Sequence, residues 1–310
     1  MRKHRGEEMI SLTAKVSRNA IALATSLHGI GTLIQDGTFR KRVVEIEPPW
    51  HCPKEFSLLE IEMPNFSMEL LMPKQITTQK KEVILQLHGG GYIGKMKNAY
   101  RDFAVLYGKM PGERMVLSVD YRVAPEHPYP AALKDAYLAY SWLLEHGYEG
   151  NQIVIAGDSA GGGLALALAL YLRDHEKPLP KKLILMSPWT DLAATGESYQ
   201  TNFEKDPLFG NTKESMIYSN DYYGDLDPKI PYISPLYGEY EGLPPMLFQV
   251  GSTEMLLSDS IRAAKKAKEA GCMVKLSVYN GMFHVFQLGM KKMKESREAW
   301  EEVERFLLKD

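Results

Sequence analysis

The chain has 310 residues, of which 45% are hydrophobic and 25% are charged, close to the averages of ordinary globular proteins. These values exclude a disordered chain, a collagen-like fibre and a coiled coil. The 37 basic and 39 acidic side chains are well mixed and give a net charge of −2, which argues against a nucleic-acid partner.

The first forty residues have a helical pattern that Gly29 and Gly31 break. Within them, residues 8–27 have the spacing of an amphipathic helix. Its predicted apolar side consists of Ile10, Ala14, Ile21, Ala24 and Leu27. We expect this helix to pack on the protein and not on a membrane, and no run in the chain reaches the roughly 20 apolar residues that span a bilayer.

The middle of the chain alternates between strand and helix patterns. Residues 42–72 predict two or three strands punctuated by prolines. Further strands are expected at Val83–Leu87, 115–119, 153–156, 183–186, 246–250 and Val274–Tyr279, and helices at 100–109, 131–146, 159–175, 258–270 and 291–308. Strands without polar alternation, separated by helices, predict a mostly parallel sheet that is covered on both faces.

This alternation stops between residues 189 and 240, where no strand-like run occurs. The stretch is rich in aromatic residues: Trp189, Tyr199, Phe203, Phe209, Tyr218, Tyr222 and Tyr223. An insertion at the C-terminal edge of a parallel sheet lies where a lid or cap would be built. Its aromatic content favours a packed cap over a surface loop.

The strongest local motif is Gly-Asp-Ser-Ala-Gly at residues 157–161, between an apolar strand pattern and an apolar helix pattern. A serine at such a junction is typical of a nucleophile elbow, whose flanking glycines permit a strained turn. The helix N-terminus beneath it favours developing negative charge. We therefore predict that Ser159 is a nucleophile; the alternative is a helix-capping serine.

A glycine run, His-Gly-Gly-Gly-Tyr, directly follows the strand Val83–Leu87 at residues 88–92. Consecutive glycines free backbone N–H groups to face a cavity, where each is worth roughly 3–4 kcal/mol to a tetrahedral oxyanion. Such a run at this strand is typical of esterases and not of a flexible turn. Ala160 would add its own N–H, and His88 is expected to orient the loop.

The serine needs a neighbouring base, because a free hydroxyl is a weak nucleophile at neutral pH. Only His284, among eight histidines, falls on a loop after a core strand in the order Ser, acid, His. The acid should follow the strand 246–250, where Glu254 and Asp259 compete. Glu254 is preferred, because Asp259 falls in the first turn of the next helix, where the dipole favours a carboxylate anyway. The acid would hold the histidine tautomer and stabilise the imidazolium.

Together these motifs resemble the hormone-sensitive-lipase family (family IV) of α/β-hydrolase esterases. The matching segments are residues 88–92, 120–130, 157–162, 187–192, 234–236, 242–245 and 283–284, within roughly 80–290. The resemblance implies an α/β-hydrolase fold with a mostly parallel central sheet, flanking helices and a helical cap. It also implies oxyanion donors at Gly90, Gly91 and Ala160, no metal and no organic cofactor.

Two further points follow from this resemblance. Many relatives carry an Asp-Pro-Leu motif where this chain has Glu254 followed by Met255 and Leu256, which makes the acid harder to assign. Asp120, Arg122 and Glu126 belong to the family's tyrosine–arginine motif, and we expect them to be scaffolding for the glycine run.

The expected organisation is an N-terminal cap segment (1–45), a first core part (46–188), a cap insertion (189–230) and a second core part (231–310). The expected activity is hydrolysis of small, short-chain acyl esters through a Ser-His-acid triad and an acyl-enzyme intermediate. One alternative is a carbohydrate acetylesterase, with Tyr222 or Tyr223 stacking on a sugar. The other is a non-catalytic small-molecule-binding protein, which the presence of His284 disfavours.

Cys52 and Cys272 form no CxxC pair, so neither a zinc site nor a disulfide framework is expected, and a reducing cytoplasm fits the chain. The expected partner is a small-molecule ester. The last strand, Val274–Tyr279, either pairs across a two-fold axis in a homodimer or has its edge covered.

Overall fold

One eight-stranded sheet organises the chain in the computed structural model, which describes residues 10–27, 30–36, 38, 47–75 and 82–309. The strand order is β1-β2-β4-β3-β5-β6-β7-β8. The strands are β1 (Phe56–Glu62), β2 (Ser67–Pro73), β3 (Val83–Leu87), β4 (Met115–Asp120), β5 (Ile153–Asp158), β6 (Lys182–Met186), β7 (Met246–Gly251) and β8 (Val274–Tyr279). Strand β2 is antiparallel to both β1 and β4, and all other neighbours are parallel. The predicted mostly parallel sheet is confirmed.

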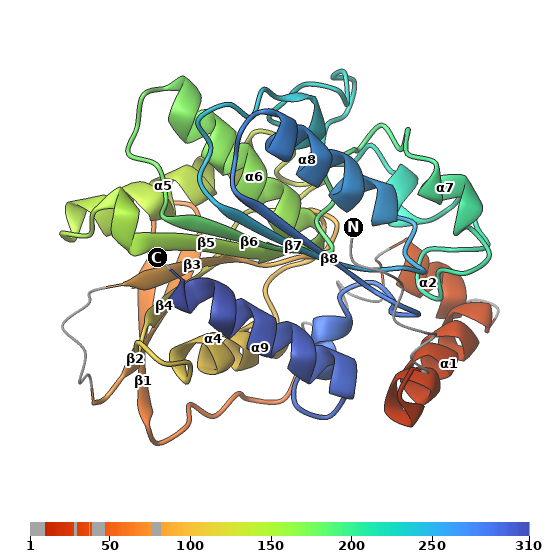
Figure 1. Cartoon of the computed structure of the whole chain (residues 1–310), viewed down its shortest axis with the longest axis horizontal. Helices are drawn as coiled ribbons and strands as arrows, with labels where there is room; N and C mark the ends of the chain where they lie inside the picture. Colours follow the sequence, from red (N-terminus) through yellow and green to blue (C-terminus); the bar gives the residue numbers. More distant parts are fainter. Residues whose placement is uncertain (1–9, 28–29, 37, 39–46, 76–81, 310) are drawn as a thin grey trace.

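Helices cover both faces of this sheet (Figure 1). Helices α4 (Asn98–Gly108) and α9 (Lys294–Leu308) lie on one face, and α5 (Ala131–Glu145), α6 (Ser159–Asp174) and α8 (Leu257–Glu269) lie on the other. Their ends agree with the predicted helices to within three residues. In the described part of the chain, no helix combines the length and the apolar character needed to cross a membrane.

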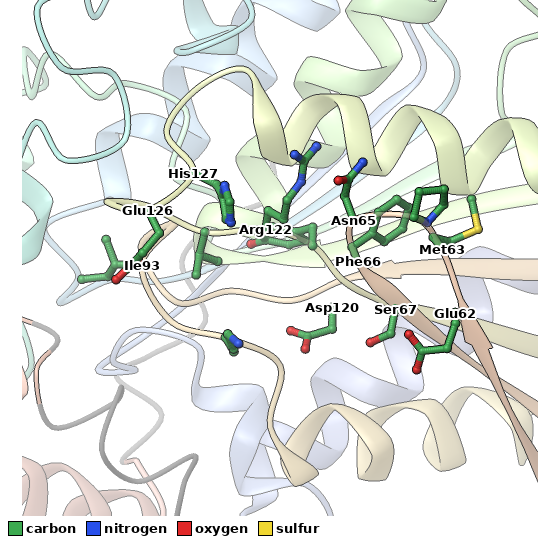
Figure 2. Close-up of a pocket in the computed structure, with 14 residues that line it drawn as sticks. Glu62, Met63, Asn65, Phe66, Ser67, Ile93, Asp120, Arg122, Glu126 and His127 are labelled. Atoms are coloured by element: carbon green, nitrogen blue, oxygen red, sulfur yellow. The ribbon is translucent and has the colours of Figure 1, made fainter.

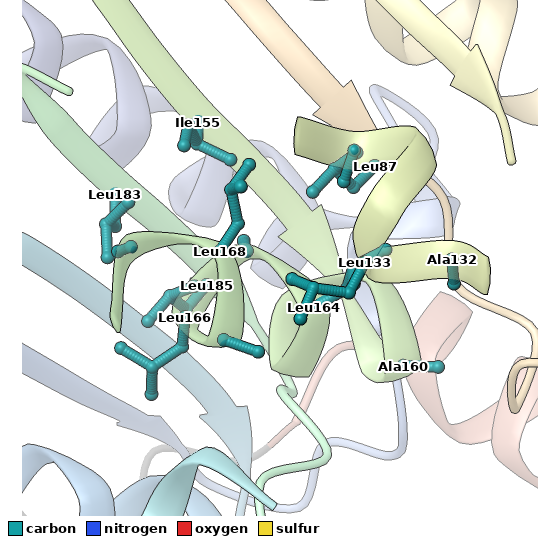
Figure 3. Close-up of a cluster of buried hydrophobic side chains, with 14 of the residues drawn as sticks. Leu87, Ala132, Leu133, Ile155, Ala160, Leu164, Leu166, Leu168, Leu183 and Leu185 are labelled. Atoms are coloured by element: carbon teal, nitrogen blue, oxygen red, sulfur yellow. The ribbon is translucent and has the colours of Figure 1, made fainter. Parts of the chain in front are cut away.

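Both faces of the sheet are apolar because each central strand buries side chains on both sides. Val83 and Leu85 belong to the core cluster beneath α5 and α6, whereas Ile84 between them joins the cluster beneath α4 and α9. Figure 3 shows leucines of α6 packed against strand residues such as Ile155 and Leu185. Successive strand residues point to opposite faces, which explains the apolar runs without polar alternation.

The N-terminal helix α1 (Leu12–Ser26) begins after Ser11, whose hydroxyl accepts a hydrogen bond from the Ala14 N–H at 3.2 Å. Ala14 is buried, and Ile10 and Ile21 pack on the same small cluster as Phe283. This confirms the predicted helix, except that Leu27 is exposed and does not join its packed side.

The short helix α2 (Ile30–Gln35) contains Gly31, so the expected helix break at this residue is wrong. A single helical glycine costs only about 1 kcal/mol, which neighbouring residues can offset. Residues 1–9, 28–29, 37 and 39–46, which include Gly29 and much of the predicted N-terminal cap segment, lie outside the described residues.

The insertion, residues 189–230, contains α7 (Ser198–Thr201) and the 3₁₀ turn η2 (Met216–Tyr218), and a further 3₁₀ turn, η3 (Pro235–Tyr237), follows it. Its aromatic side chains are buried or half-buried, so the expected packing is confirmed. The buried ones are Trp189, Tyr199, Phe209 and Tyr222. Helix α1 contacts this insertion, because Thr25 Oγ1 donates to the Pro207 carbonyl at 2.9 Å and Arg18 Nη2 to the Lys205 carbonyl at 3.4 Å.

Candidate active site

The carboxyl ends of four parallel strands meet at one edge of the sheet. In the strand register, Leu87 at the end of β3 pairs with Gly157 of β5, and Asp158 pairs with Met186 of β6. Met186 in turn pairs with Gln249 of β7. The segments that follow these strands, each holding one of the predicted motifs, are therefore neighbours in space.

Ser159 lies on a strained turn between β5 and α6, with a φ of +52° in the left-handed region. Glycine is required on both sides of it. A Cβ at Gly157 would lie 2.2 Å from the Gly161 carbonyl oxygen, and one at Gly161 would lie 2.2 Å from the Leu87 carbonyl oxygen. The Gly-x-Ser-x-Gly spacing thus lets α6 begin directly against the end of β3.

A hydrogen-bonded chain connects three residues from three separate segments: the start of α6, the turn after β7 and the segment after β8. His284 Nε2 lies 2.9 Å from Ser159 Oγ, and His284 Nδ1 lies 2.9 Å from Glu254 Oε2. An ionised carboxylate only accepts, so Nδ1 carries the proton and Nε2 accepts from the serine hydroxyl. Glu254 is fully buried and His284 is 7% exposed. The arrangement places a base beside a hydroxyl and orients it with a carboxylate.

The second oxygen of Glu254 is held by Ser187, a residue for which the sequence predicted no role. Glu254 Oε1 accepts from Ser187 Oγ at 2.8 Å and from the Gly251 N–H at 2.5 Å. The same Ser187 hydroxyl accepts from the Val285 N–H at 3.2 Å, and Ser187 itself has a φ of +45°. Ser187 therefore connects the turn that bears the carboxylate to the loop that bears His284.

Asp259, the competing carboxylate, binds the start of the insertion and not the histidine. Its Oδ2 accepts from the backbone N–H groups of Thr190 and Asp191, at 2.8 Å each. Burial raises the pKa of Asp259 well above its usual range, and the nearby carboxylate of Asp191 raises it further. It lies in the first turn of α8, where the sequence placed it.

The glycine run is anchored to the serine turn by the residue that precedes the serine. Asp158 Oδ1 accepts from the Gly89 N–H at 2.9 Å, a contact that the sequence did not reveal. Gly90 and Gly91 have φ values of +131° and +64°, which favour glycine. Within the described residues, neither of their N–H groups has a protein acceptor. The N–H of Ala160 lies in the first turn of α6, where no intrahelical acceptor exists.

The segment after β4 supports the glycine run from behind. The His88 ring stacks on Tyr121 with centroids 4.0 Å apart, and Tyr121 Oη donates to the His88 carbonyl at 2.5 Å. Asp120 Oδ1 accepts from the Met96 N–H at 2.9 Å, and Arg122 pairs with Asp135 at 2.7 Å. These contacts support the expected scaffolding role of Asp120 and Arg122, whereas Glu126 is exposed and takes part in none of them.

A cleft of about 830 Å³ lies beside this scaffold (Figure 2). Its lining comes from residues 62–67 between β1 and β2, from Ile93 and Lys95 after the glycine run, and from the segment that contains Asp120, Arg122, Glu126 and His127. None of the three residues of the hydrogen-bonded chain lines this cleft.

Side chains of the insertion pack against residues on either side of the serine. The Phe209 ring packs against the His284 ring with centroids 4.8 Å apart, and the Met216 side chain lies beside Gly91. Tyr222 stacks on Tyr92 with centroids 3.8 Å apart and is buried. Tyr222 is therefore part of the packed insertion and presents no free face to a sugar.

Comparison with known proteins agrees with this geometry. The family model of the alpha/beta hydrolase fold matches residues 84–288. An acetyl-hydrolase of Streptomyces hygroscopicus is 38% identical over 229 residues, which are 74% of this chain and 76% of that protein. A crystal structure of an esterase from the bacterial hormone-sensitive lipase family is 33% identical with a TM-score of 0.84, covering 96% of this chain and 98% of that one. A structure of EstE5 soaked with p-nitrophenyl butyrate is 32% identical with a TM-score of 0.84 and the same coverage.

The fold and the site together define an α/β hydrolase. Within that class the chain belongs to the hormone-sensitive-lipase family, and it is a carboxylesterase, a serine hydrolase by type. The predicted family, fold and enzyme class are thereby confirmed.

Proposed function

We propose that the protein hydrolyses small esters of short acyl chains, with Ser159 as nucleophile, His284 as base and Glu254 as the orienting acid. The observation that supports this most is the unbroken chain of hydrogen bonds from Glu254 through His284 to Ser159, with 2.9 Å at each step. Nucleophile, base and orienting group within hydrogen-bond reach are the signature of a serine hydrolase.

The reaction then proceeds in two halves. Ser159 Oγ attacks the acyl carbon while its proton passes to His284 Nε2, and the carbonyl oxygen becomes an oxyanion. The N–H groups of Gly90, Gly91 and Ala160 donate to that oxyanion, and Glu254 stabilises the imidazolium. As the tetrahedral species collapses, the ester bond breaks and the leaving alcohol takes the proton from Nε2. Water then attacks the acyl-enzyme by the same route and releases the acid.

The preference for short acyl groups is supported by the side chains that the insertion places at the site. Phe209 against His284 and Met216 beside Gly91 limit the space around the reacting carbon. The similarity to an acetyl-hydrolase, and to an esterase soaked with a butyrate ester, points the same way.

A series of p-nitrophenyl esters from acetate to octanoate tests this preference. We expect kcat/KM to be highest for acetate or butyrate and at least about 10-fold lower for octanoate, because pocket fit discriminates by about 1–3 kcal/mol per misfitting group. Met216→Ala should raise the octanoate-to-acetate ratio. A kcat/KM that rises steadily to octanoate in the unmodified enzyme would contradict the short-chain proposal.

We also infer that α1 and the insertion form one cap, in line with the expected segments 1–45 and 189–230. The hydrogen bonds from Arg18 and Thr25 to the insertion support this arrangement.

The free thiols of Cys52 and Cys272 support the proposal of a reducing cytoplasm.

We further infer that two copies pair through β8, the last strand of the sheet, which pairs with β7 alone in the described chain. Around it, the apolar side chains of Met273, Leu276 and Val278 are 68%, 37% and 46% exposed. Exposed apolar strand edges favour pairing with another chain.

Light scattering should give the mass of a dimer, and Val278→Lys should give a monomer, since it places like charges across the two-fold axis. A monomeric mass for the unmodified protein would refute this pairing.

A further inference from the structure

Two side chains of the insertion bind the backbone on both sides of Glu254. We call residues 251–256 the acid turn. Asn202 Nδ2 donates to the Glu254 carbonyl at 2.8 Å and to the Ser252 carbonyl at 3.1 Å. Asp206 Oδ2 accepts from the Met255 N–H at 2.8 Å. Asn202 is 4% exposed and Asp206 is 1% exposed, so water competes little for these contacts.

The same Asp206 carboxylate also fixes the aromatic residue that packs on the histidine. Its Oδ1 accepts from the N–H groups of Leu208 at 2.8 Å and Phe209 at 3.1 Å. Phe209 is the residue whose ring lies 4.8 Å from the His284 ring. One buried carboxylate therefore holds the acid turn on one side and a neighbour of His284 on the other.

Burying the Asp206 carboxylate costs free energy. Among the described residues, no direct ion pair to Asp206 offsets that cost. Burial raises the pKa of Asp206, and the three backbone N–H donors and the nearby His284 partly oppose that rise. A buried charged group that is fully hydrogen-bonded to the backbone specifies one geometry of the segments that it joins.

Helix α1 rests on the same segment. Arg18 and Thr25 donate to the carbonyls of Lys205 and Pro207, which flank Asp206 in the sequence. The contacts thus run from α1 through residues 202–209 to the acid turn and His284.

We propose that Asn202 and Asp206 are positioning residues of this esterase, through which the insertion sets the orientation of Glu254 and His284. The proposal rests on the proposed roles of those two residues. It makes the insertion part of the catalytic support and not only a cover over the substrate. The physical reason is that a displacement of about 1 Å in a catalytic group can lower the rate by about 10²-fold.

The test compares Asp206→Asn and Asn202→Ala with Glu204→Gln, which changes an exposed carboxylate on the same segment. With p-nitrophenyl butyrate we expect each of the first two to lower kcat by about 10- to 100-fold and to change KM by less than about 3-fold. Glu204→Gln should match the unmodified enzyme. Asn202→Ala alters no charge, so a loss of kcat in this variant cannot come from the loss of a carboxylate. If thermal unfolding shows that Asp206→Asn is unfolded, Asn202→Ala alone carries the test.

A double-mutant cycle then shows whether the two residues act through Glu254. In a Glu254→Gln background, Asp206→Asn or Asn202→Ala should lower kcat by less than about 3-fold more, because the group that they position is already disabled. An equal loss in both backgrounds, or a rise in KM with kcat unchanged, would overturn the proposal. Unmodified kcat in both single variants, with Glu254→Gln impaired, would refute the positioning role alone. Unmodified kcat in Glu254→Gln would instead refute the proposed function.

Discussion

Ser159→Ala is expected to lower kcat for p-nitrophenyl butyrate by about 10⁵- to 10⁶-fold, the size of effect seen when a serine hydrolase loses its nucleophile. The hydroxyl is the group that His284 Nε2 contacts at 2.9 Å, and no other hydroxyl contacts that nitrogen in the described chain. Alanine carries the same Cβ as serine, so the turn at φ +52° is not strained further. Stopped-flow or long-time absorbance assays of released p-nitrophenol measure the loss.

The matched control is Ser260→Ala. Ser260 is a fully buried serine, whereas Ser159 is 7% exposed, and the Ser260 hydroxyl has no hydrogen-bond partner within the described residues. This change should leave kcat unmodified, and both variants should keep the thermal midpoint to within a few degrees. If the kcat of Ser159→Ala lay within 10-fold of that of the unmodified enzyme, Ser159 would not be the nucleophile.

Glu254→Gln is expected to lower kcat by about 10⁴-fold, because an amide can present N–H to His284 Nδ1 and so favour the wrong histidine tautomer. Asp259→Asn should lower kcat by less than about 5-fold, since its carboxylate binds backbone N–H groups away from the histidine and an amide oxygen can still accept from them. Each variant replaces one buried carboxyl group by the corresponding amide, at the candidate acid or at its competitor, so each serves as the control of the other.

Steady-state kinetics of both variants on the same ester decide between the carboxylates. A large loss in Asp259→Asn together with normal turnover in Glu254→Gln would reverse the assignment of the acid.

The sequence predicted most of what depends on local pattern. The serine turn and the glycine run each directly follow a strand in the sequence. Their residue types therefore indicate the local backbone geometry. Glycine at 157 and 161 is required by carbonyl oxygens 2.2 Å from any added Cβ, which the motif already indicated. The helix ends were predicted closely because apolar runs and their interruptions are also local.

The contacts that support the acid could not be predicted in this way. Ser187 adopts a left-handed φ that is unusual for serine, and it meets Glu254 from 67 positions away. Asn202 lies 52 positions before Glu254, in a stretch with no periodicity to interpret. Such contacts arise only when the strand register places distant turns side by side. The error at Gly31 has a local origin: α1 ends at Ser26 and α2 begins at Ile30, so the interruption lies just before Gly31, which is the second residue of α2.

Covalent trapping of the nucleophile tests the central claim most directly. The enzyme is treated with diethyl p-nitrophenyl phosphate, and peptide mass spectrometry then locates the phosphoryl group while residual esterase activity is followed. The account predicts one adduct per chain, on Ser159, that forms in step with the loss of activity and is absent in Ser159→Ala. Inactivation that accompanies an adduct on a different residue, or full activity in a chain phosphorylated at Ser159, would contradict it.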